Sequence, residues 1–333
     1  MIRREEASHM SKKPKVFIDG QEGTTGLQIY ERLGKREDIQ LLRIDPEKRK
    51  DPAERKKLLN TADLVFLCLP DAAAREAVDM IESETTRVID ASTAHRTAEG
   101  WIYGFPELNP GQRERIRTAR RVANPGCHAT GFISIVYPLV ALGLLPRDAA
   151  LSCFSLTGYS GGGKKMIAQY EGPHKTEAMC SPGIYSVLQN HKHLPEMQRV
   201  CGLERPPVFS PIVDDYYKGM ATTVPLHMDQ LQGVSTLHQV WRAMADYYGT
   251  DDGRRLVHVA GDPTDEEGGI EPDSKIYGGS MAGKDRMSLI VAGNDHQFTI
   301  TALFDNLGKG ASGAAVQNMN LMLGFPETTG LSL

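Results

Sequence analysis

The first 125 residues alternate short apolar runs with amphipathic segments. Residues 15–19, 40–44, 64–70 and 87–90 are predicted strands, and the run 64–70 is almost continuously apolar, as expected for a strand buried on both faces. Segment 27–33 has the pattern of an amphipathic helix, and Asp71 can cap a helix that follows the third strand. Strands that alternate with helices predict an α/β fold with a Rossmann-type, doubly wound parallel sheet.

The pattern changes near residue 127, where a long apolar segment covers residues 132–145. Beyond it the predicted helices are 236–248 and 311–323, and residues 158–165 form a glycine-rich loop. The predicted strands are 151–157, 208–213, 220–226, 256–259, 289–293 and 297–304. These longer segments predict an α+β domain with a mainly antiparallel sheet over 127–305. We expect a nucleotide-binding domain over 10–126, which the C-terminal helical segment 306–333 completes.

Composition narrows the class of protein. The 333 residues are 40% hydrophobic and 24% charged with a net charge of −4, typical of a globular protein without a polyanion-binding surface, so nucleic acid is not expected as a partner. No apolar run reaches the roughly 18 residues that a membrane-spanning helix needs. Five cysteines without a C-x-x-C pair favour a reducing compartment, and we expect a cytoplasmic protein. Residues 1–9 resemble an expression-tag remnant, with Met10 as the expected native start.

A glycine loop stands between the first predicted strand and helix. Gly20, Gly23 and Gly26 have G-x-x-G-x-x-G spacing, and Thr24 and Thr25 lie between the last two. Glycines let a backbone approach a phosphate, and the helix N-terminus faces the anion, so the loop is a candidate dinucleotide cradle. The alternative is a glycine-rich turn without a ligand.

The end of the second predicted strand bears on the choice of dinucleotide. Asp45 suits the ribose 2′-hydroxyl of NAD, but Arg43 precedes it and Lys48, Arg49 and Lys50 follow it. Cations suit a 2′-phosphate, so this loop favours NADP. A solvated charged loop is the alternative.

Cys127 lies on a Pro-Gly turn, Asn124-Pro125-Gly126, directly before the apolar segment. A cysteine that begins a helix is favoured as thiolate by the free N–H groups and the helix dipole, and the thiolate is the nucleophile. The alternative is a small apolar residue in a tight turn.

Two further groups of residues are candidates for the chemistry. Ser92 and Arg96 follow the strand 87–90, so they should face the ligand edge of the sheet, where Arg96 would clamp a phosphate; an exposed surface arginine is the alternative. His191, His193 and Glu196 cluster, but no cysteine pair completes a zinc site, so no metal is predicted and a general base beside the thiol is favoured. The alternative is a set of helix-capping polar residues.

Six stretches in order carry a family resemblance. They cover residues 19–27, 90–96, 124–127, 158–163, 191–196 and 305–311. With them the chain resembles the N-acetyl-γ-glutamyl-phosphate reductases, more particularly their shorter second type, within the superfamily of aspartate-semialdehyde dehydrogenase and glyceraldehyde-3-phosphate dehydrogenase. Lys218-Gly219 departs from the Arg-Gly of many longer relatives.

The resemblance implies NADPH-dependent reduction of N-acetyl-L-glutamyl 5-phosphate to the 5-semialdehyde and phosphate through a Cys127 thioester, in arginine biosynthesis. The backbone N–H groups of Cys127 and His128 would bind the oxyanion. His193, or else His191, would hold the thiolate and protonate the aldehyde oxygen, with Glu196 orienting His193. The expected substrate or phosphate contacts are Ser92, Arg96, Asn124, Ser160, Gly161 and Lys218. The expected cofactor contacts are Gly20, Gly23, Thr24, Thr25, Gly26, Arg43, Lys48, Pro70, Ser92, Gly158, Gly162, Asn306 and Lys309.

Several alternatives stay open at this point. Aspartate-semialdehyde dehydrogenase performs the same chemistry on a shorter substrate, and a carrier-linked aminoadipyl-phosphate reductase would need a basic docking surface. A cofactor-binding regulatory or redox-sensing protein is the non-enzymatic alternative. The expected partners are the small acyl-phosphate substrate and further copies of the chain in a homodimer or homotetramer.

Overall fold

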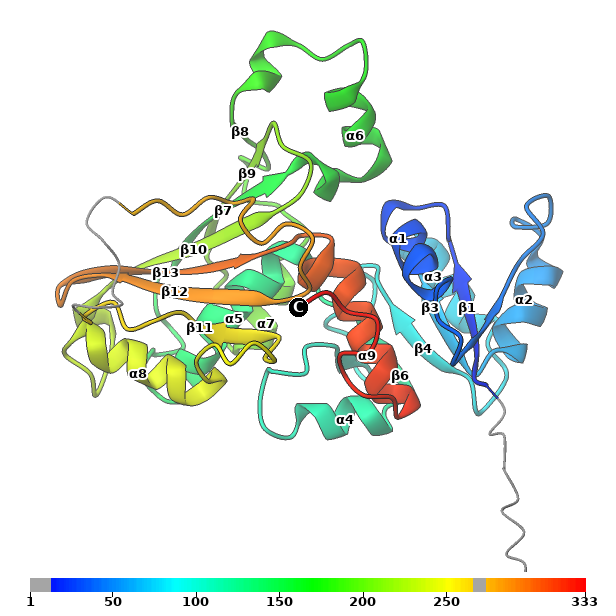
Figure 1. The fold of residues 1–333 in the computed structure, drawn as a ribbon, viewed down its shortest axis with the longest axis horizontal. Helices are drawn as coiled ribbons and strands as arrows, with labels where there is room; N and C mark the ends of the chain where they lie inside the picture. Colours follow the sequence, from blue (N-terminus) through cyan, green and yellow to red (C-terminus); the bar gives the residue numbers. More distant parts are fainter. Residues whose placement is uncertain (1–12, 266–273) are drawn as a thin grey trace, which may run out of the picture.

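The computed structural model describes residues 13–265 and 274–333, arranged around two β-sheets that lie side by side (Figure 1). Residues 1–9 and Met10, expected to be a tag remnant and the native start, lie outside the described residues. Within the described ranges, no helix is both long and apolar enough to cross a membrane. The same ranges contain no group of three or more acidic, histidine or cysteine residues that could hold a metal ion.

The first sheet, sheet A, is parallel throughout and has the order β2-β1-β3-β4-β6-β5. Its strands are β1 (Lys15–Asp19), β2 (Gln40–Leu42), β3 (Leu64–Leu67), β4 (Arg87–Asp90), β5 (Ile102–Tyr103) and β6 (Arg121–Ala123). The predicted doubly wound sheet is confirmed. Because successive side chains of a strand point to opposite faces, Val16 and Ile18 of β1 pack into one core and Phe17 into another.

Helices cover both faces of sheet A. They are α1 (Thr24–Leu33), α2 (Pro52–Thr61), α3 (Asp71–Asp79), α4 (Gln112–Thr118) and, from the end of the chain, α9 (Gly313–Leu323). Helices α1, α4 and α9 share one core with the strands, and α2 and α3 share the other. Met319 and Met322 of α9 are buried in the first of these cores, so the C-terminal helix packs on sheet A (Figure 1).

The second sheet, sheet B, is mixed and mainly antiparallel, with the order β11-β12-β13-β10-β7-β9-β8. Its strands are β7 (Ser152–Gly158), β8 (Gly183–Ile184), β9 (Val208–Asp214), β10 (Met220–His227), β11 (Val257–Val259), β12 (Met287–Gly293) and β13 (Gln297–Phe304). The predicted strand positions and the mainly antiparallel character are confirmed.

The helices near sheet B are α5 (Cys127–Ala141), α6 (Gly163–Glu171), α7 (Leu194–Cys201) and α8 (Leu237–Tyr248). Short helical turns cover Tyr159–Gly162, Glu177–Cys180, Met228–Gln230 and Gly308–Ser312. Helix α5 is apolar around most of its circumference and shares a core with sheet B, α7 and α8. This packing supports our proposed domain boundary at residue 127, with 306–333 returning to the first domain.

Two local predictions are wrong. Residues 158–165 are not a loop throughout, because a helical turn begins at Tyr159 and α6 at Gly163. Asp71 does not cap α3: it is the first residue of that helix, and its carboxylate accepts hydrogen bonds from the backbone N–H and the hydroxyl of Thr93. The carboxylate is therefore directed to Thr93 rather than to the N–H groups of α3.

Candidate active site

A cleft of about 550 Å³ opens between the two sheets, where α1 and α5 both begin. Its wall combines segments far apart in the sequence. They are 23–26, 68–69, Ala91, Arg96, 124–128, Thr157, 160–164, Met166, Tyr185, 191–193, Val213, 306–307 and 310–311. The structure therefore brings the glycine loop, the cysteine turn and the histidine cluster to one site.

The glycine loop packs closely under the start of α1. Gly20 has a φ of +86°, and a Cβ on Gly26 would lie 2.3 Å from the Gly20 carbonyl oxygen, so a side chain at either place would disrupt the turn. Helix α1 begins after Gly23 without a capping side chain. The Thr24 Oγ1 is buried and has no hydrogen-bond partner among the described residues. Free N–H groups and an unpartnered hydroxyl suit a dinucleotide phosphate, so these residues fit the expected cofactor.

The charged residues after β2 do not form part of the cleft wall. The Arg43 guanidinium lies over the Tyr30 ring, and Arg49 forms an ion pair with Glu22 of the glycine loop. Lys48 is exposed and closes a turn through its backbone N–H to Asp45. The 2′-phosphate role predicted for Arg43 and Lys48 therefore stays a prediction. Pro70, which precedes α3, is exposed and is not among the wall residues.

The cysteine turn is built around Gly126. A Cβ at this position would lie 2.3 Å from Nη1 of Arg96 and 2.4 Å from Nε2 of His193. Because glycine leaves that space free, both side chains reach the backbone directly before Cys127. Helix α5 then begins at Cys127, again without a capping side chain, so its first N–H groups are free for an oxyanion.

Arg96 is held from three sides by the residues around it. Its Nε donates to the Asn124 carbonyl (3.0 Å) and its Nη2 to the Ala91 carbonyl (3.2 Å). Its Nη1 donates to the Glu196 carboxylate (3.0 Å). The guanidinium is buried in the cleft wall rather than exposed at the surface, so the alternative of a surface arginine is wrong.

Glu196 does not orient His193, contrary to the prediction. Its carboxylate accepts hydrogen bonds from the Gly126 N–H (2.8 Å), the Tyr103 hydroxyl (2.7 Å) and Arg96. His193 is the residue before α7 and Glu196 lies in the first turn of that helix, but the donors that reach the Glu196 carboxylate come from Tyr103, the cysteine turn and Arg96. Glu196 instead fixes the cysteine turn and the guanidinium.

The two histidines differ in their partners. The Nδ1 of His191 accepts the His193 backbone N–H (3.2 Å), whereas the buried Nδ1 of His193 has no partner in the described parts of the chain. Burial lowers the pKa of His193 well below its usual value, and Arg96 adds to the effect. Burial and Lys192 lower the pKa of His191 to about 4. Both rings are therefore neutral near pH 7, each with a lone pair on one nitrogen, and burial lowers the proton affinity of both.

Burial raises the pKa of the Cys127 thiol above its usual value. The His128 N–H, Arg96 and Lys192 act in the opposite direction but do not outweigh burial. The sequence suggested a thiol already ionised by the helix N-terminus, whereas the structure favours a protonated thiol next to neutral histidines.

Several predicted contacts do not reach the cleft wall. Ser92 Oγ donates to the Asp90 carboxylate (2.7 Å) behind it, and the Lys218 ammonium lies 3.6 Å from Asp305. Asn124 does contribute to the wall, and its side-chain amide donates to the carbonyl of Ala311, another wall residue (3.1 Å). Gly20 and Gly158 support the wall from behind, because a Cβ on Gly158 would meet the backbone of residues 216–218.

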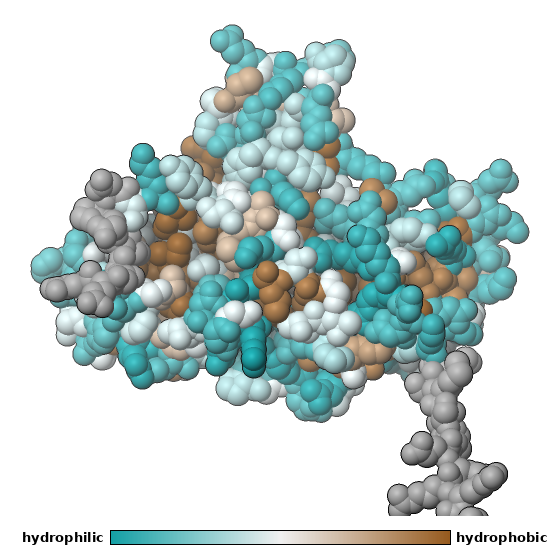
Figure 2. All heavy atoms as spheres, viewed as in Figure 1, coloured by the Kyte–Doolittle hydropathy of each residue, from teal (hydrophilic) through white to brown (hydrophobic). Residues whose placement is uncertain are grey.

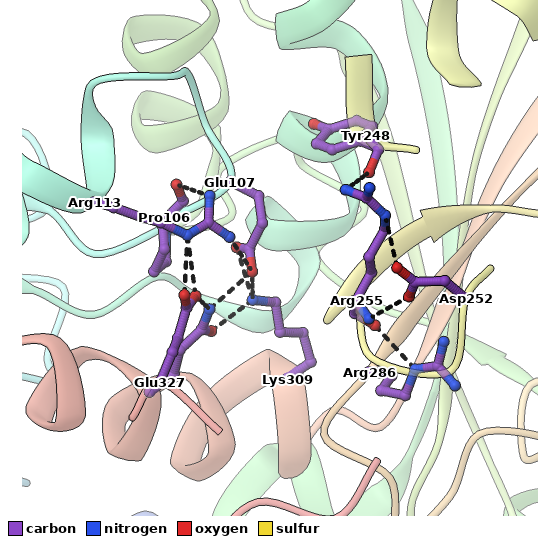
Figure 3. Close-up of polar contacts among 10 residues, drawn as sticks. Pro106, Glu107, Arg113, Tyr248, Asp252, Arg255, Arg286, Lys309 and Glu327 are labelled. Carbon is purple, nitrogen blue, oxygen red and sulfur yellow. Dashed lines mark hydrogen bonds and ion pairs between the residues drawn. The ribbon is translucent and has the colours of Figure 1, made fainter. Parts of the chain in front are cut away.

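Lys309 is the clearest departure from the expected cofactor contacts (Figure 3). Its ammonium is buried and donates to both Glu107 oxygens (2.9 and 2.8 Å) and to the Gln317 side chain (2.6 Å). All three of its donors are used away from the cleft, because the helical turn Gly308–Ser312 aims this side chain at the loop after β5.

Ser160, Gly161, Gly162 and Asn306 do line the cleft. The Asn306 amide donates to Ser160 Oγ (3.0 Å), and its oxygen accepts the Gly219 N–H (2.8 Å), so the end of sheet B and the glycine turn after β7 are joined. Thr25 also lies on the wall, beside Thr24.

The sequence interpretation missed several wall residues. Lys192 and Lys164 are exposed cations for which the described residues supply no ion pair or side-chain hydrogen bond. The position of Lys192 between the two histidines was a usable signal. Tyr185 and the His128 side chain also line the cleft, and no sequence signal pointed to them.

Comparison with known proteins gives two family matches. Residues 20–119 match the family described as semialdehyde dehydrogenase, NAD binding domain. Residues 127–306 match the family described as semialdehyde dehydrogenase, dimerisation domain.

Curated relatives cover nearly the whole chain. N-acetyl-gamma-glutamyl-phosphate reductase 2 of Nostoc sp. is 46% identical over 325 residues, which are 96% of this chain and 99% of the relative. N-acetyl-gamma-glutamyl-phosphate reductase of Chelativorans sp. is 48% identical over 93% of this chain and 98% of its own length.

Solved structures share the fold. Aspartate semialdehyde dehydrogenase II of Vibrio cholerae, complexed with ASA, has a TM-score of 0.66 at 18% identity, covering 94% of this chain and 99% of that one. Aspartate semialdehyde dehydrogenase of Candida albicans, solved with NADP, has a TM-score of 0.61 at 14% identity, with coverage of 94% and 99%.

Proposed function

Because the chain belongs to the semialdehyde dehydrogenase family, and within it to the N-acetyl-gamma-glutamyl-phosphate reductases, we propose that it reduces N-acetyl-L-glutamyl 5-phosphate with NADPH. The products are N-acetyl-L-glutamate 5-semialdehyde and phosphate, and the reaction belongs to arginine biosynthesis. One observation carries the proposal: Cys127 begins α5 in the same cleft as the uncapped start of α1, with Arg96 and His193 against the preceding glycine.

This chain's own groups would hold the cofactor. The N–H groups at the start of α1 and the Thr24 hydroxyl would bind its phosphates, and Gly161 and Gly162 of the cleft wall would contact it. When bound, the nicotinamide supplies the hydride that reduces the acyl group. Lys48, with Arg43, favours the 2′-phosphate of NADP from beyond β2.

Cys127 is the nucleophile of the proposed mechanism. Neutral His193 takes the thiol proton at Nε2, and the thiolate attacks the acyl carbon. Arg96 and Lys192 hold the phosphate that leaves as the thioester forms. The N–H groups of Cys127 and His128 bind each tetrahedral oxyanion, and one such donor is worth about 3–4 kcal/mol in other enzymes.

The remaining steps regenerate the enzyme. His193 returns its proton to the oxygen of the reduced, sulfur-bound intermediate. His193 takes this proton back as the intermediate collapses and the aldehyde leaves, and then gives it to the released thiolate, which restores the Cys127 thiol. Glu196 holds Arg96 and Gly126 in place throughout and exchanges no proton with the substrate.

The proposal is tested in the phosphate-dependent reverse direction, with N-acetylglutamate 5-semialdehyde and aspartate semialdehyde as parallel substrates and NADP and NAD as acceptors. We expect the N-acetylated substrate and NADP to be preferred, and no turnover without phosphate. Cys127→Ser should lower the rate by about 10³-fold or more. Preference for aspartate semialdehyde, or normal activity of Cys127→Ser, would contradict the proposal.

A homo-oligomer is proposed on the basis of exposed apolar residues near one edge of sheet B. Ile184, Val187, Leu188 and Val208 are each more than 60% exposed. Figure 2 shows hydrophobic patches on the visible face among largely hydrophilic residues. Apolar surface of this kind is typical of subunit contacts. Light scattering should give a dimer or tetramer, and Leu188→Asp should shift it toward monomer.

The five described cysteines are all free thiols, which supports a reducing compartment, and we propose the cytoplasm. Extracts fractionated by compartment should contain the activity in the cytoplasmic fraction. Recovery of the activity with membranes would contradict this assignment.

A further inference from the structure

A chain of hydrogen bonds runs from the interior of sheet B to the cleft. Thr222 Oγ1 of β10 lies 2.7 Å from Ser155 Oγ of β7, and Ser155 Oγ lies 2.8 Å from Nδ1 of His128 on α5. On the other side of the imidazole, Nε2 lies 2.7 Å from the Tyr185 hydroxyl. The mechanism above uses none of these four side chains.

The inner end of this chain is sealed. Thr222 and Ser155 are fully buried, and His128 is 3% exposed. Helix α5 passes so close to Thr222 that a Cβ on Gly131 would lie 2.4 Å from its hydroxyl oxygen. Among the described residues the Thr222 hydroxyl has no partner besides Ser155.

The outer end is open. Tyr185 is half-buried and lines the cleft together with Cys127, His191 and His193. Burial raises the pKa of its phenol, and the charge that Cys127 carries as a thiolate raises it further, so the hydroxyl stays protonated and lies within electrostatic reach of the nucleophile.

The number of protons determines the direction in which these hydrogen bonds are donated. Burial, with His191 and Lys192, lowers the pKa of His128 to about 3, so its ring is neutral and carries a single N–H. Three hydroxyls and one N–H supply four protons, while the three hydrogen bonds use three of them. One proton is therefore left over: it is on Tyr185 when the ring carries Nε2–H, and on Thr222 or Ser155 when the ring carries Nδ1–H.

A left-over proton on Thr222 or Ser155 would be a buried donor without an acceptor, which is costly. With the opposite direction, Thr222 donates to Ser155, Ser155 to Nδ1 of His128, and Nε2–H to the Tyr185 oxygen. Every buried donor is then satisfied, and the phenol proton is the one that remains, at the cleft.

We propose that Tyr185 is a substrate-binding residue that donates its phenol proton to an oxygen of the acyl phosphate beside Cys127, and that Thr222, Ser155 and His128 are positioning residues acting through it. This proposal rests on the proposed function for the identity of the substrate. The direction of the chain, with His128 as the Nε2–H tautomer, does not depend on the substrate.

The first test is kinetic. Tyr185→Phe keeps the ring and removes the donor, and should lower kcat/KM for the N-acetylated substrate about 30-fold, because hydrogen bonds to charged oxygens are the strong ones. Ser155→Ala should lower it about fivefold in the natural protein and less than twofold in the Tyr185→Phe background, because it acts only through Tyr185. Ser288→Ala, a half-buried serine of β12, is the matched control and should leave kcat/KM unchanged.

Additive effects of Tyr185→Phe and Ser155→Ala, or a Tyr185→Phe enzyme with normal kcat/KM, would overturn the proposal. The second test reads the ring directly, because ¹⁵N chemical shifts of a histidine distinguish its tautomers. We expect Nε2–H at His128 from pH 6 to pH 8, and the Nδ1–H tautomer would reverse the chain and overturn the proposal. This measurement needs no substrate, so it decides the direction even if the wild-type enzyme fails on N-acetylglutamate 5-semialdehyde.

Discussion

Two clusters of polar side chains differ in how completely their groups are paired. In the network of Figure 3, the Lys309 ammonium uses all three donors on Glu107 and Gln317, and Glu107 also lies 3.7 Å from Arg113. At the cleft, Thr24 Oγ1 and His193 Nδ1 have no partner among residues 13–265 and 274–333. Three other buried polar atoms of the described chain also lack partners, on Tyr216, Tyr248 and Asn318, so an unpaired atom does not by itself indicate a site.

The difference separates a structural cluster from a functional one. Burial opposes charge on Glu107, yet Lys309 and Arg113 together outweigh it and lower the pKa of this carboxyl. A saturated buried network of this kind holds segments together but has no capacity left for a ligand. The cleft contains unpaired polar groups. These groups lower the stability of the folded protein, but they are available to bind a substrate.

The largest effect is expected from His193→Asn, which removes the base at the cleft. We expect kcat to fall about 10³-fold, while the melting temperature stays within a few degrees because the ring has an unpaired nitrogen. His191→Asn is the matched variant, and it retains an acceptor for the His193 N–H, so the loss should be tenfold or less. If steady-state kinetics show the same loss of kcat for both variants, neither histidine alone is the base.

Lys309→Met tests the fully paired network of Lys309 and Glu107. The buried Glu107 loses its closest cation, so the free energy of unfolding should fall by about 3–5 kcal/mol in urea denaturation. The folded fraction should retain its KM for NADP, since the side chain does not reach the cleft. The double variant Glu107→Gln/Lys309→Met should regain part of the lost free energy of unfolding. If Lys309→Met instead raises the KM for NADP and leaves stability normal, Lys309 contacts the cofactor.

Lys192→Gln removes an exposed, unpaired cation from the cleft wall. We expect the KM for the acyl phosphate to rise about tenfold with little change in stability, because a single exposed charge contributes little to folding. Lys165→Gln, which changes an exposed lysine outside the wall, is the control. A loss of stability without a change in KM would show that Lys192 belongs with the structural cluster.

The smallest effect concerns the thiol. Burial raises the pKa of Cys127, so its thiolate fraction grows only at a higher pH than for an ordinary cysteine. Iodoacetamide labelling of Cys127 should be several-fold slower at pH 8 than labelling of the exposed Cys180, and should still rise above pH 9. Peptide mass spectrometry reports both sites in one sample, and a plateau for Cys127 below pH 8 would contradict the raised pKa.

Local patterns were sufficient for much of the fold. The apolar run 64–70 predicted a strand buried on both faces, and β3 occupies its first four residues with every side chain buried. The glycines at 20, 23 and 26 predicted a turn that the backbone of α1 closely approaches. Short-range signals of this kind act through the residue's own backbone and its immediate neighbours, so they are visible in the sequence.

The sequence by itself determined which residue types were available: a cysteine at a helix start, a histidine pair and a glycine loop. Only the tertiary structure decided which of them meet. Glu196 accepts hydrogen bonds from Arg96 and Gly126 rather than from His193. The Lys309 ammonium donates to Glu107. The His128 ring forms hydrogen bonds with Ser155 and Tyr185. These outcomes depend on partners 27 to 202 residues away. A side chain's hydrogen bonds are set by the groups that packing brings within about 3 Å, and no sequence spacing encodes that distance.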